Sequence, residues 1–291
     1  MLDKIKGGLF GVAIGDALGG TTEFMSEQEI KNKYGQLTDI IGGGVWHLKP
    51  GEVTDDTAMT MCVTKGIITS PDDPILHIGE EFLKWYNQKP KDVGIIISQV
   101  LTTFTGNWEK AAKDVHYQLS EKSAGNGSLM RCLPIALAYS DLQELEELTI
   151  RQSKMTHYDD LAAEACLIYN RIAARLLKGD DLEASLRDEI AGTIYEDALT
   201  NEPDCPPDGF VVHTMKWVVY FLSHMKTFEE VAVAAANKGH DTDTVAAIAC
   251  GLKGVEVGYE QLPQRYKEKI LIFDDLSQAA ADLAEIRKIR R

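Results

Sequence analysis

Asp241-Thr242-Asp243-Thr244 runs directly into the apolar stretch Val245–Cys250, and the much earlier Thr54-Asp55-Asp56 leads in the same way into Ala58–Val63. Each acidic cluster stands where an irregular polar stretch gives way to a sequence of helical character. Asp and Thr favour helix N-termini, because their oxygens accept backbone N–H groups and the helix dipole attracts negative charge. The carboxylates and hydroxyls of the two clusters nevertheless exceed what two helix caps need. If the fold brings the clusters together, they form an oxygen-only site with enough charge for two divalent cations, which indicates a metal-dependent enzyme.

Either cluster alone is typical of an ordinary helix start with an acidic first turn. Together they are harder to explain in that way, because each also follows a turn that contains glycine, at Gly51 and at Gly239. A Mg²⁺ or Mn²⁺ site needs several oxygens that converge from rigid elements, with some positions left to water or substrate. We therefore favour the joint interpretation, in which both clusters serve one site.

Apolar residues at helical spacing dominate the rest of the chain. Between Asp159 and Gly179 they recur at every third or fourth position, and Gly179 closes the segment as expected for a helix C-terminus. Similar patterns predict helices over residues 4–17, 57–68, 74–87, 93–103, 108–119, 141–150, 182–199, 211–224, 228–238, 244–254 and 275–287. No stretch alternates as a strand over more than a few residues, and no hairpin signal appears. The fold is therefore predicted to be all-α.

Two of these helices are rich in small residues, namely Gly7–Ala13 and Ala246–Gly254. Glycine lowers helix stability, so its use there indicates close backbone packing at the centre of a bundle. Because the acidic clusters flank most of the chain, a site that uses both requires one closed domain. We expect a single domain over residues 1–291.

Composition excludes several classes of partner. The chain has 291 residues, with 30 Lys and Arg against 45 Asp and Glu, for a net charge of −15. Such a surface repels nucleic acid and anionic membranes. The five cysteines show no C-x-x-C spacing. We expect them to be reduced and to pack as small buried apolar side chains, as in a reducing compartment. With no targeting signal and no membrane-length apolar run, we expect a cytoplasmic protein that binds neither nucleic acid nor membrane.

A glycine-rich segment, Ser123–Arg131, forms a third signal. Its glycines allow close backbone approach, and the following stretch, 129–138, is compatible with a helix despite Pro134. Backbone N–H groups of such a loop make a neutral cradle for an anion, which suits a phosphate-bearing ligand in a protein this acidic. An ordinary turn around Gly125-Asn126-Gly127 is the alternative.

Three further residues are candidates on weaker grounds. Asp16, at the end of the first helix, could orient a helix end or ligands of a metal, and Glu23 lies in a loop where it could carry protons. Either could equally be a solvated charge. The seven histidines form no i, i+4 pair, so a zinc site is not expected, and His157 is the best candidate among them for a ligand contact.

Four motifs in this order resemble the ADP-ribosylglycohydrolases, most closely the dinitrogenase reductase-activating type. They are Gly7–Gly19, Gly42–Met59, Gly125–Arg131 and Asp241–Thr244, and the likeness runs from about residue 4 to residue 258. The resemblance implies a compact, single-domain orthogonal helix bundle with a dinuclear metal centre at the base of a cleft. It implies a hydrolase that cleaves the N-glycosidic bond between ADP-ribose and an acceptor side chain, most often arginine.

The resemblance also implies roles for individual residues. Two divalent cations, Mg²⁺ or Mn²⁺, would be held by Thr54, Asp55, Asp56, Asp241, Asp243 and Thr244. ADP-ribose would contact Gly125, Asn126, Gly127, Ser128, Leu129 and Met130, with His157 nearby and Phe210 over the nucleotide. Asp55 or Glu23 would act as the base, and Asp92 matches an acid on the arginine side. The substrate would be an ADP-ribosylated protein or an ADP-ribosyl small molecule.

The alternatives are a protein that binds ADP-ribose with little turnover, a hydrolase of another ADP-ribose linkage, and a metal phosphohydrolase. The metal phosphohydrolase is suggested by the adjacent His240 and Asp241. Such an enzyme needs further histidine ligands on neighbouring helices, and the spacing of the other histidines does not provide an obvious set. The chain departs from many relatives at His240, where they carry glycine, and at Ile95-Ile96-Ile97, where they often carry a polar residue. Both departures concern the contacts on the acceptor side.

Overall fold

The centre of the protein is a pair of antiparallel helices whose backbones touch. Helix α1 (Leu2–Gly19) presents a glycine at every fourth position, and each one faces a carbonyl oxygen of α13 (Thr242–Val257). A Cβ built on these glycines would lie 2.2 to 2.4 Å from that oxygen, in the pairs Gly7 with Gly254, Gly11 with Cys250, Gly15 with Ala246 and Gly19 with Thr242. Any side chain at these four positions would force the helices apart. The glycines therefore allow the first helix of the chain to pack directly against α13, near its other end. The expected close packing of small residues is confirmed.

The computed structural model describes residues 1–290, and in this part of the chain it contains fifteen α-helices and no sheet. The prediction of an all-α fold is confirmed. Besides α1 and α13, the α-helices are α2 (Glu27–Tyr34), α3 (Asp55–Thr69), α4 (Ile75–Asn87), α5 (Ile95–Thr103), α6 (Trp108–Gln118), α7 (Leu133–Ala138), α8 (Leu142–Lys154), α9 (Asp160–Lys178), α10 (Leu182–Ile190), α11 (Val211–His224), α12 (Phe228–Ala236), α14 (Gln264–Lys267) and α15 (Phe273–Ile289). Three short 3₁₀ helices complete the order: η1 (Asn126–Ser128), η2 (Glu196–Leu199) and η3 (Tyr259–Gln261).

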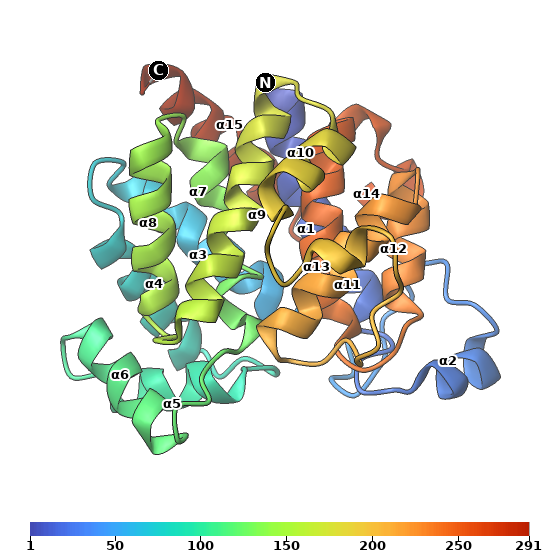
Figure 1. Ribbon diagram of the computed structural model, residues 1–291, viewed down its shortest axis with the longest axis horizontal. Coiled ribbons are helices and arrows are strands. Elements are labelled where there is room, and N and C mark those ends of the chain that lie inside the picture. Colours follow the sequence, from blue (N-terminus) through green and yellow to red (C-terminus); the bar gives the residue numbers. More distant parts are fainter. Residues whose placement is uncertain (291) are drawn as a thin grey trace.

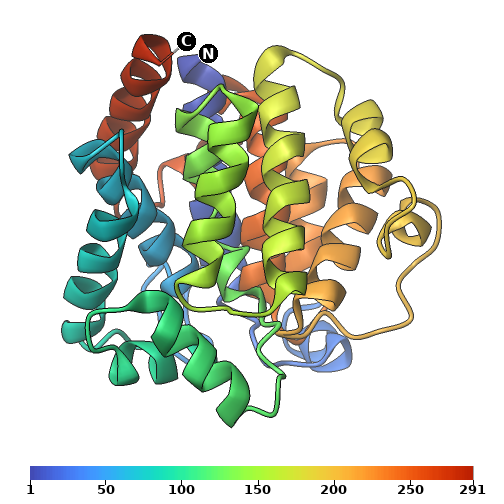
Figure 2. The ribbon, with the colours of Figure 1, turned by 60° about the vertical axis from the view of Figure 1, so that its left-hand side comes forward.

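The other helices surround the α1–α13 pair (Figure 1). The first turn of α1 and the last turns of α15 lie at one end of the molecule, whereas α2, α5 and α6 lie at the opposite end (Figures 1 and 2). Because α1 ends where α13 begins, the start of α13 lies at that opposite end, and α3 begins beside it. No helix of the described residues combines the length and the apolar character that crossing a bilayer requires.

Several helix boundaries differ from the prediction, each for a local reason. The helix predicted over residues 182–199 ends at Ile190, because Gly192 adopts a left-handed φ of 73°, and only the 3₁₀ turn η2 follows. The helix considered over 129–138 begins at Leu133, with Pro134 in its first turn. The sequence analysis missed α2, although Ser26 and Glu29 form a capping box at its start.

Candidate active site

The two acidic clusters lie at helix N-termini, yet they do not cap those helices. In residues 1–290, every helix that begins after Ser, Thr, Asn or Asp is capped by that side chain, except α3 after Thr54 and α13 after Asp241. For α3, Asp16 of α1 does this work instead: its carboxylate accepts the Thr54 N–H at 2.9 Å, the Thr57 N–H at 3.0 Å and the Thr57 hydroxyl. The side chains of Thr54 and Asp241 are therefore free for another purpose. Asp16 holds the start of α3 in place, which is one of the roles considered for it from the sequence.

The structure brings the early and late clusters together. The Thr244 hydroxyl lies 3.1 Å from Asp56 Oδ2, and the Thr54 hydroxyl lies 3.4 Å from both Asp56 Oδ2 and Asp243 Oδ2. Asp241 joins the same group at the start of α13, where its Oδ2 accepts a 2.6 Å hydrogen bond from the Asn126 amide. Asp55 Oδ2 accepts the Gly94 N–H at 3.1 Å. All six oxygen-bearing residues predicted as ligands thus meet where α3 and α13 begin.

Glu23 and Asp92 approach the same cluster from loops. One carboxylate oxygen from each of Glu23, Asp92 and Asp243 lies within 4.8 Å of the other two, a spacing that could hold a metal ion. Glu23 is only 6% exposed and accepts a 2.5 Å hydrogen bond from the indole N–H of Trp46. Asp243 therefore belongs to two overlapping sets of oxygens, the predicted ligand set and this triad.

Most of these carboxylates are buried, Asp92 and Asp241 are partly buried, and none has a compensating positive charge in the described part of the chain. Among residues 1–290, none of Asp16, Glu23, Asp55, Asp56, Asp92, Asp241 and Asp243 takes part in an ion pair. Burial raises the pKa of Asp55 to about 6 and that of Glu23 to about 7, and it raises the pKa values of Asp56 and Asp243 well above their ordinary range. Burial, together with the charges of Asp55 and Glu23, raises the pKa of Asp92 to about 9.

The donor set fits a hard divalent cation. Oδ1 of Asp56 is buried and has no hydrogen-bond partner among the described residues, and a buried carboxylate oxygen in that condition is costly unless a cation binds it. Carboxylate and hydroxyl oxygens are the ligands that Mg²⁺ and Mn²⁺ prefer. A cation would also offset the clustered negative charge that raises the pKa values.

The acidic cluster forms one wall of a cavity of about 700 Å³. The glycine-rich loop also lines it, through Gly125, Asn126, Gly127 and Met130. Ser128 and Leu129 were predicted to contact the ligand, but both are fully buried, and the Ser128 hydroxyl lies 2.9 Å from that of Ser153 in the core. Neither residue is among those that line the cavity.

His157 lines the same cavity and is 1% exposed. A Cβ on Gly125 would lie 3.1 Å from its Nε2 atom, and a Cβ on Gly127 would lie 3.1 Å from its Cε1 atom. The two glycines therefore let the imidazole lie flat against the loop, beside the acidic wall. The structure accordingly places His157 at the cavity, against the glycine-rich loop.

Phe210 does not line this cavity but an adjoining one of about 440 Å³. Its ring is 38% exposed, and its segment is tied to the glycine-rich loop by the pairing of Gly125 with Phe210. The two cavities share Ile96, Lys122, Gly125 and Gly209, so they lie side by side, and we refer to them together as the groove. A ligand longer than a single sugar could extend from the acidic cluster toward Phe210.

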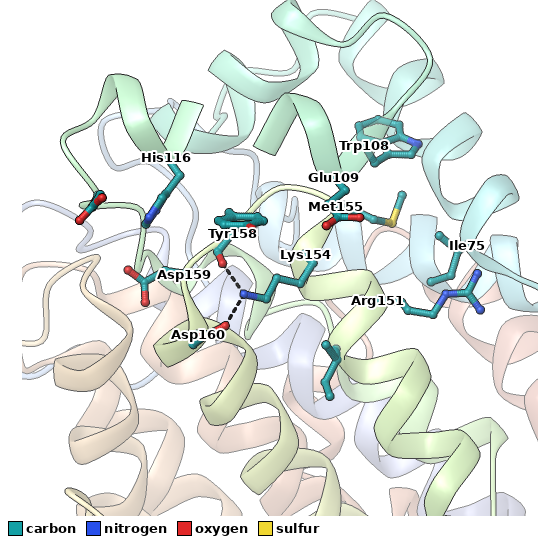
Figure 3. Close-up of a pocket in the computed structure, with 12 residues that line it drawn as sticks. Ile75, Trp108, Glu109, His116, Arg151, Lys154, Met155, Tyr158, Asp159 and Asp160 are labelled. Atoms are coloured by element: carbon teal, nitrogen blue, oxygen red, sulfur yellow. Dashed lines mark hydrogen bonds and ion pairs between the residues drawn. The ribbon is translucent and has the colours of Figure 1, made fainter. Parts of the chain in front are cut away.

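Another cavity, of about 720 Å³, lies between α6, the end of α8 and the start of α9 (Figure 3). Its cationic groups are already paired: Lys154 Nζ lies 2.5 Å from Asp160, and Arg151 lies 3.0 Å from Asp73. None of the predicted site residues is among the described residues that line it. The candidate site is therefore the cavity at the acidic cluster.

Sequence reasoning missed two residues of this site, Trp46 and Lys122, and one interaction of the predicted residue Asn126. Trp46 reaches Glu23 from a loop in which Gly42, Gly43 and Gly44 all have positive φ, and an aromatic residue in such a loop carries no signal of its own. The Asn126 side chain links the glycine-rich loop to Asp241 and donates a second hydrogen bond, of 2.9 Å, to Thr214. Lys122 is an exposed cation beside both cavities.

Known proteins resemble this chain over nearly its whole length. A family model described as ADP-ribosylglycohydrolase matches residues 1–291. The chain is 32% identical over 271 residues to the ADP-ribosyl-dinitrogen reductase glycohydrolase of Rhodospirillum rubrum, covering 92% of this chain and 90% of the relative. It is 26% identical over 298 residues to an ADP-ribosylarginine hydrolase of Serratia proteamaculans, covering 97% of this chain and 79% of the relative.

A solved ADP-ribosylglycohydrolase-related protein complex has the same fold, with a TM-score of 0.85 at 26% identity and 98% coverage of both chains. The resemblance drawn from the four sequence motifs is thereby confirmed over the whole length. The chain belongs to the ADP-ribosylglycohydrolase family.

Proposed function

We propose that the protein hydrolyses the N-glycosidic bond between ADP-ribose and an arginine side chain, and that it uses two divalent cations, Mg²⁺ or Mn²⁺, to do so. The observation that carries the proposal is the buried acidic cluster without counter-charge, set against a glycine-rich loop in one groove. We infer ADP-ribose as the substrate moiety from membership of the family, and arginine as the acceptor from the activity of the ADP-ribosylarginine hydrolase to which the chain is similar. We infer that residues 1–291 act as one domain, because the site takes residues from both ends of the chain.

The charge of the cavity supports arginine as the acceptor. An ADP-ribosylated arginine keeps a guanidinium group, whereas an ester- or ether-linked acceptor is neutral. Glu23 and Asp92 present acidic side chains beside Asp243, and their oxygens can accept hydrogen bonds from the N–H groups of a guanidinium, whose positive charge favours their ionised forms. Ile95, Ile96 and Ile97 line the neighbouring wall, where they suit the methylene chain of arginine. His240, the other departure from the family pattern, also lines the cavity.

Hydrolysis breaks the bond between the anomeric carbon and the guanidinium nitrogen and forms a bond from that carbon to a water oxygen. Divalent cations, when bound by Thr54, Asp55, Asp56, Asp241, Asp243 and Thr244, supply Lewis-acid chemistry at this point. Asp55 or Glu23 takes the proton of the attacking water. Asp92 holds the departing guanidine and returns a proton to its nitrogen, a role that agrees with a pKa raised to about 9.

The groove orients the rest of the substrate. The diphosphate lies along the glycine-rich loop where it lines the cavity, and the exposed Lys122 adds a positive charge beside it. Phe210 offers an exposed ring to the adenine at the far end of the groove. Fixing the substrate at both ends places the anomeric carbon against the acidic cluster.

The test measures free ADP-ribose released from ADP-ribosylarginine with Mg²⁺, with Mn²⁺ and with a chelator. Release with either cation and none with the chelator supports the proposal, and Asp55→Asn and Asp243→Asn should each lower it at least 100-fold. Serine-linked ADP-ribose and nucleotides, assayed in parallel, separate the alternatives. Binding of ADP-ribose without any release would instead identify a binding protein.

A further inference from the structure

A buried arginine lies behind the cavity and belongs to no ion pair of the described residues. Arg131 directly follows the glycine-rich loop and is fully buried, with its guanidinium 4.5 Å from the Phe82 ring centroid. It donates hydrogen bonds to the Gln152 side chain and backbone at 3.2 Å each, and to the Thr156 hydroxyl at 2.8 Å. A guanidinium has donors only, so the Thr156 oxygen must accept this bond.

Because the Thr156 oxygen accepts from Arg131, its hydroxyl hydrogen is left to be donated to His157. The Thr156 side chain is fully buried, and its oxygen lies 2.8 Å from Nδ1 of His157. Among residues 1–290, Nδ1 is the sole acceptor that the hydroxyl hydrogen can reach. If Nδ1 carried a hydrogen instead, the hydroxyl hydrogen would be buried without a partner, which disfavours that state by roughly 10- to 100-fold.

The hydrogen-bond pattern therefore fixes which nitrogen of His157 is protonated. Nδ1 accepts from Thr156, so the neutral ring carries its hydrogen on Nε2. Nε2 is the atom beside Gly125, on the cavity side of the ring, and no described residue accepts from it. Burial, and secondarily the charge of Arg131, lower the pKa of His157 to about 3, which keeps the ring neutral at physiological pH.

We propose that Arg131 and Thr156 are positioning residues that lock His157 in the Nε2–H tautomer, so that His157 serves as a fixed hydrogen-bond donor to an anionic oxygen of the ligand. In this arrangement His157 neither accepts nor releases a proton during the reaction. The identity of the ligand, a diphosphate oxygen of ADP-ribose, rests on the proposed function. The tautomer itself rests only on the contacts of the three side chains.

The first test is a ¹⁵N–¹H long-range correlation spectrum of the uniformly labelled full chain at pH 7, with His157→Gln to assign the ring. We expect a protonated Nε2 and an unprotonated Nδ1. Thr156→Val removes the hydroxyl at nearly constant volume and should produce a mixture of tautomers, whereas Thr156→Ser should restore the wild-type pattern. Thr149→Val, the same change at another buried threonine, should leave the His157 signals unchanged.

A second measurement tests whether the fixed tautomer of His157 contributes to ligand binding. Calorimetric titration of ADP-ribose should give a Kd about 10-fold higher for Thr156→Val than for wild type and for Thr156→Ser, while adenosine, which lacks phosphate, should bind all three equally. Arg131→Met should raise the Kd for ADP-ribose as Thr156→Val does. If Arg131→Met does not fold, the comparison of Thr156→Val with Thr156→Ser is the test.

A wild-type ring protonated on Nδ1, or on both nitrogens, overturns the proposal whatever the protein binds. Equal ADP-ribose affinity in Thr156→Val and wild type overturns the role of the lock in binding. The expected tautomer in a protein that binds no ADP-ribose supports the lock and rejects the proposed function.

Discussion

Removing divalent cations should make the stability of this protein fall as the pH rises from 6.5 to 8.0. The reason is the set of buried carboxylates without counter-charge, of which Asp92 is the best defined. Burial and the charges of Asp55 and Glu23 raise the pKa of Asp92 from 3.8 to about 9. In this pH window the folded protein therefore keeps a proton on Asp92 that the unfolded chain has lost. A group whose folded pKa is raised stabilises the fold at low pH, and this contribution is lost as the pH rises toward the folded value.

The magnitude follows from the number of protons. One extra proton on the folded state costs 1.36 kcal/mol per pH unit, so Asp92 alone lowers the free energy of unfolding by roughly 2 kcal/mol across about 1.5 units. For a chain of this length the melting temperature should fall by about 4 °C. Asp56 and Asp243, with pKa values raised in the same direction, add to the fall. His157 opposes the fall only slightly: with a folded pKa of about 3 and an ordinary value of 6.5, it offsets about 0.4 kcal/mol, near the lower edge of the window.

Differential scanning calorimetry in chelator, and in millimolar Mg²⁺ or Mn²⁺, measures the effect. The chelated protein should melt at least about 4 °C lower at pH 8.0 than at pH 6.5, and the cations should abolish the difference because they stabilise the ionised carboxylates. Asp92→Asn, which cannot titrate, should reduce the slope in chelator. A chelated protein whose melting temperature is level or rises over this range would refute the reasoning.

Three further changes test other parts of the structure. Gly11→Ala places a methyl 2.2 Å from the Cys250 carbonyl oxygen and should lower the free energy of unfolding by about 1–3 kcal/mol in urea titration, whereas Gly209→Ala, which adds a methyl to open space, should not. Trp46→Phe removes the indole donor to Glu23 and should lower kcat about 10-fold with an unchanged circular dichroism spectrum; an unchanged kcat would show that this hydrogen bond is dispensable. Lys122→Ala should raise KM several-fold at low ionic strength and by less in 0.5 M salt, and a KM independent of Lys122 would remove it from the binding groove.

The residues proposed as metal ligands stand out in the sequence because each lies at a helix start. Thr54 and Asp241 lie at cap positions, and the excess of oxygen over capping need is visible without coordinates. The glycine spacing of α1 likewise indicates close packing. Its partner was identified only in structure, where Gly11 faces Cys250, because the spacing alone does not say which helix approaches.

Other parts depend on tertiary contacts that leave no local pattern. Trp46 is an aromatic residue in an irregular loop, and only the fold brings it to Glu23. The chain from Arg131 through Thr156 to His157 joins segments more than twenty residues apart, so its hydrogen bonds cannot be inferred from spacing. The break after Ile190 was missed because Gly192 lies in a sequence that otherwise keeps its helical pattern.

The central claim is that aspartates from the two ends of the chain share divalent cations beside the groove. An anomalous difference map from crystals grown with Mn²⁺ measures this directly. The account predicts two peaks within coordination distance of the carboxylates of Asp55, Asp56, Asp241 and Asp243. A well-ordered map with no peak at these oxygens would contradict it.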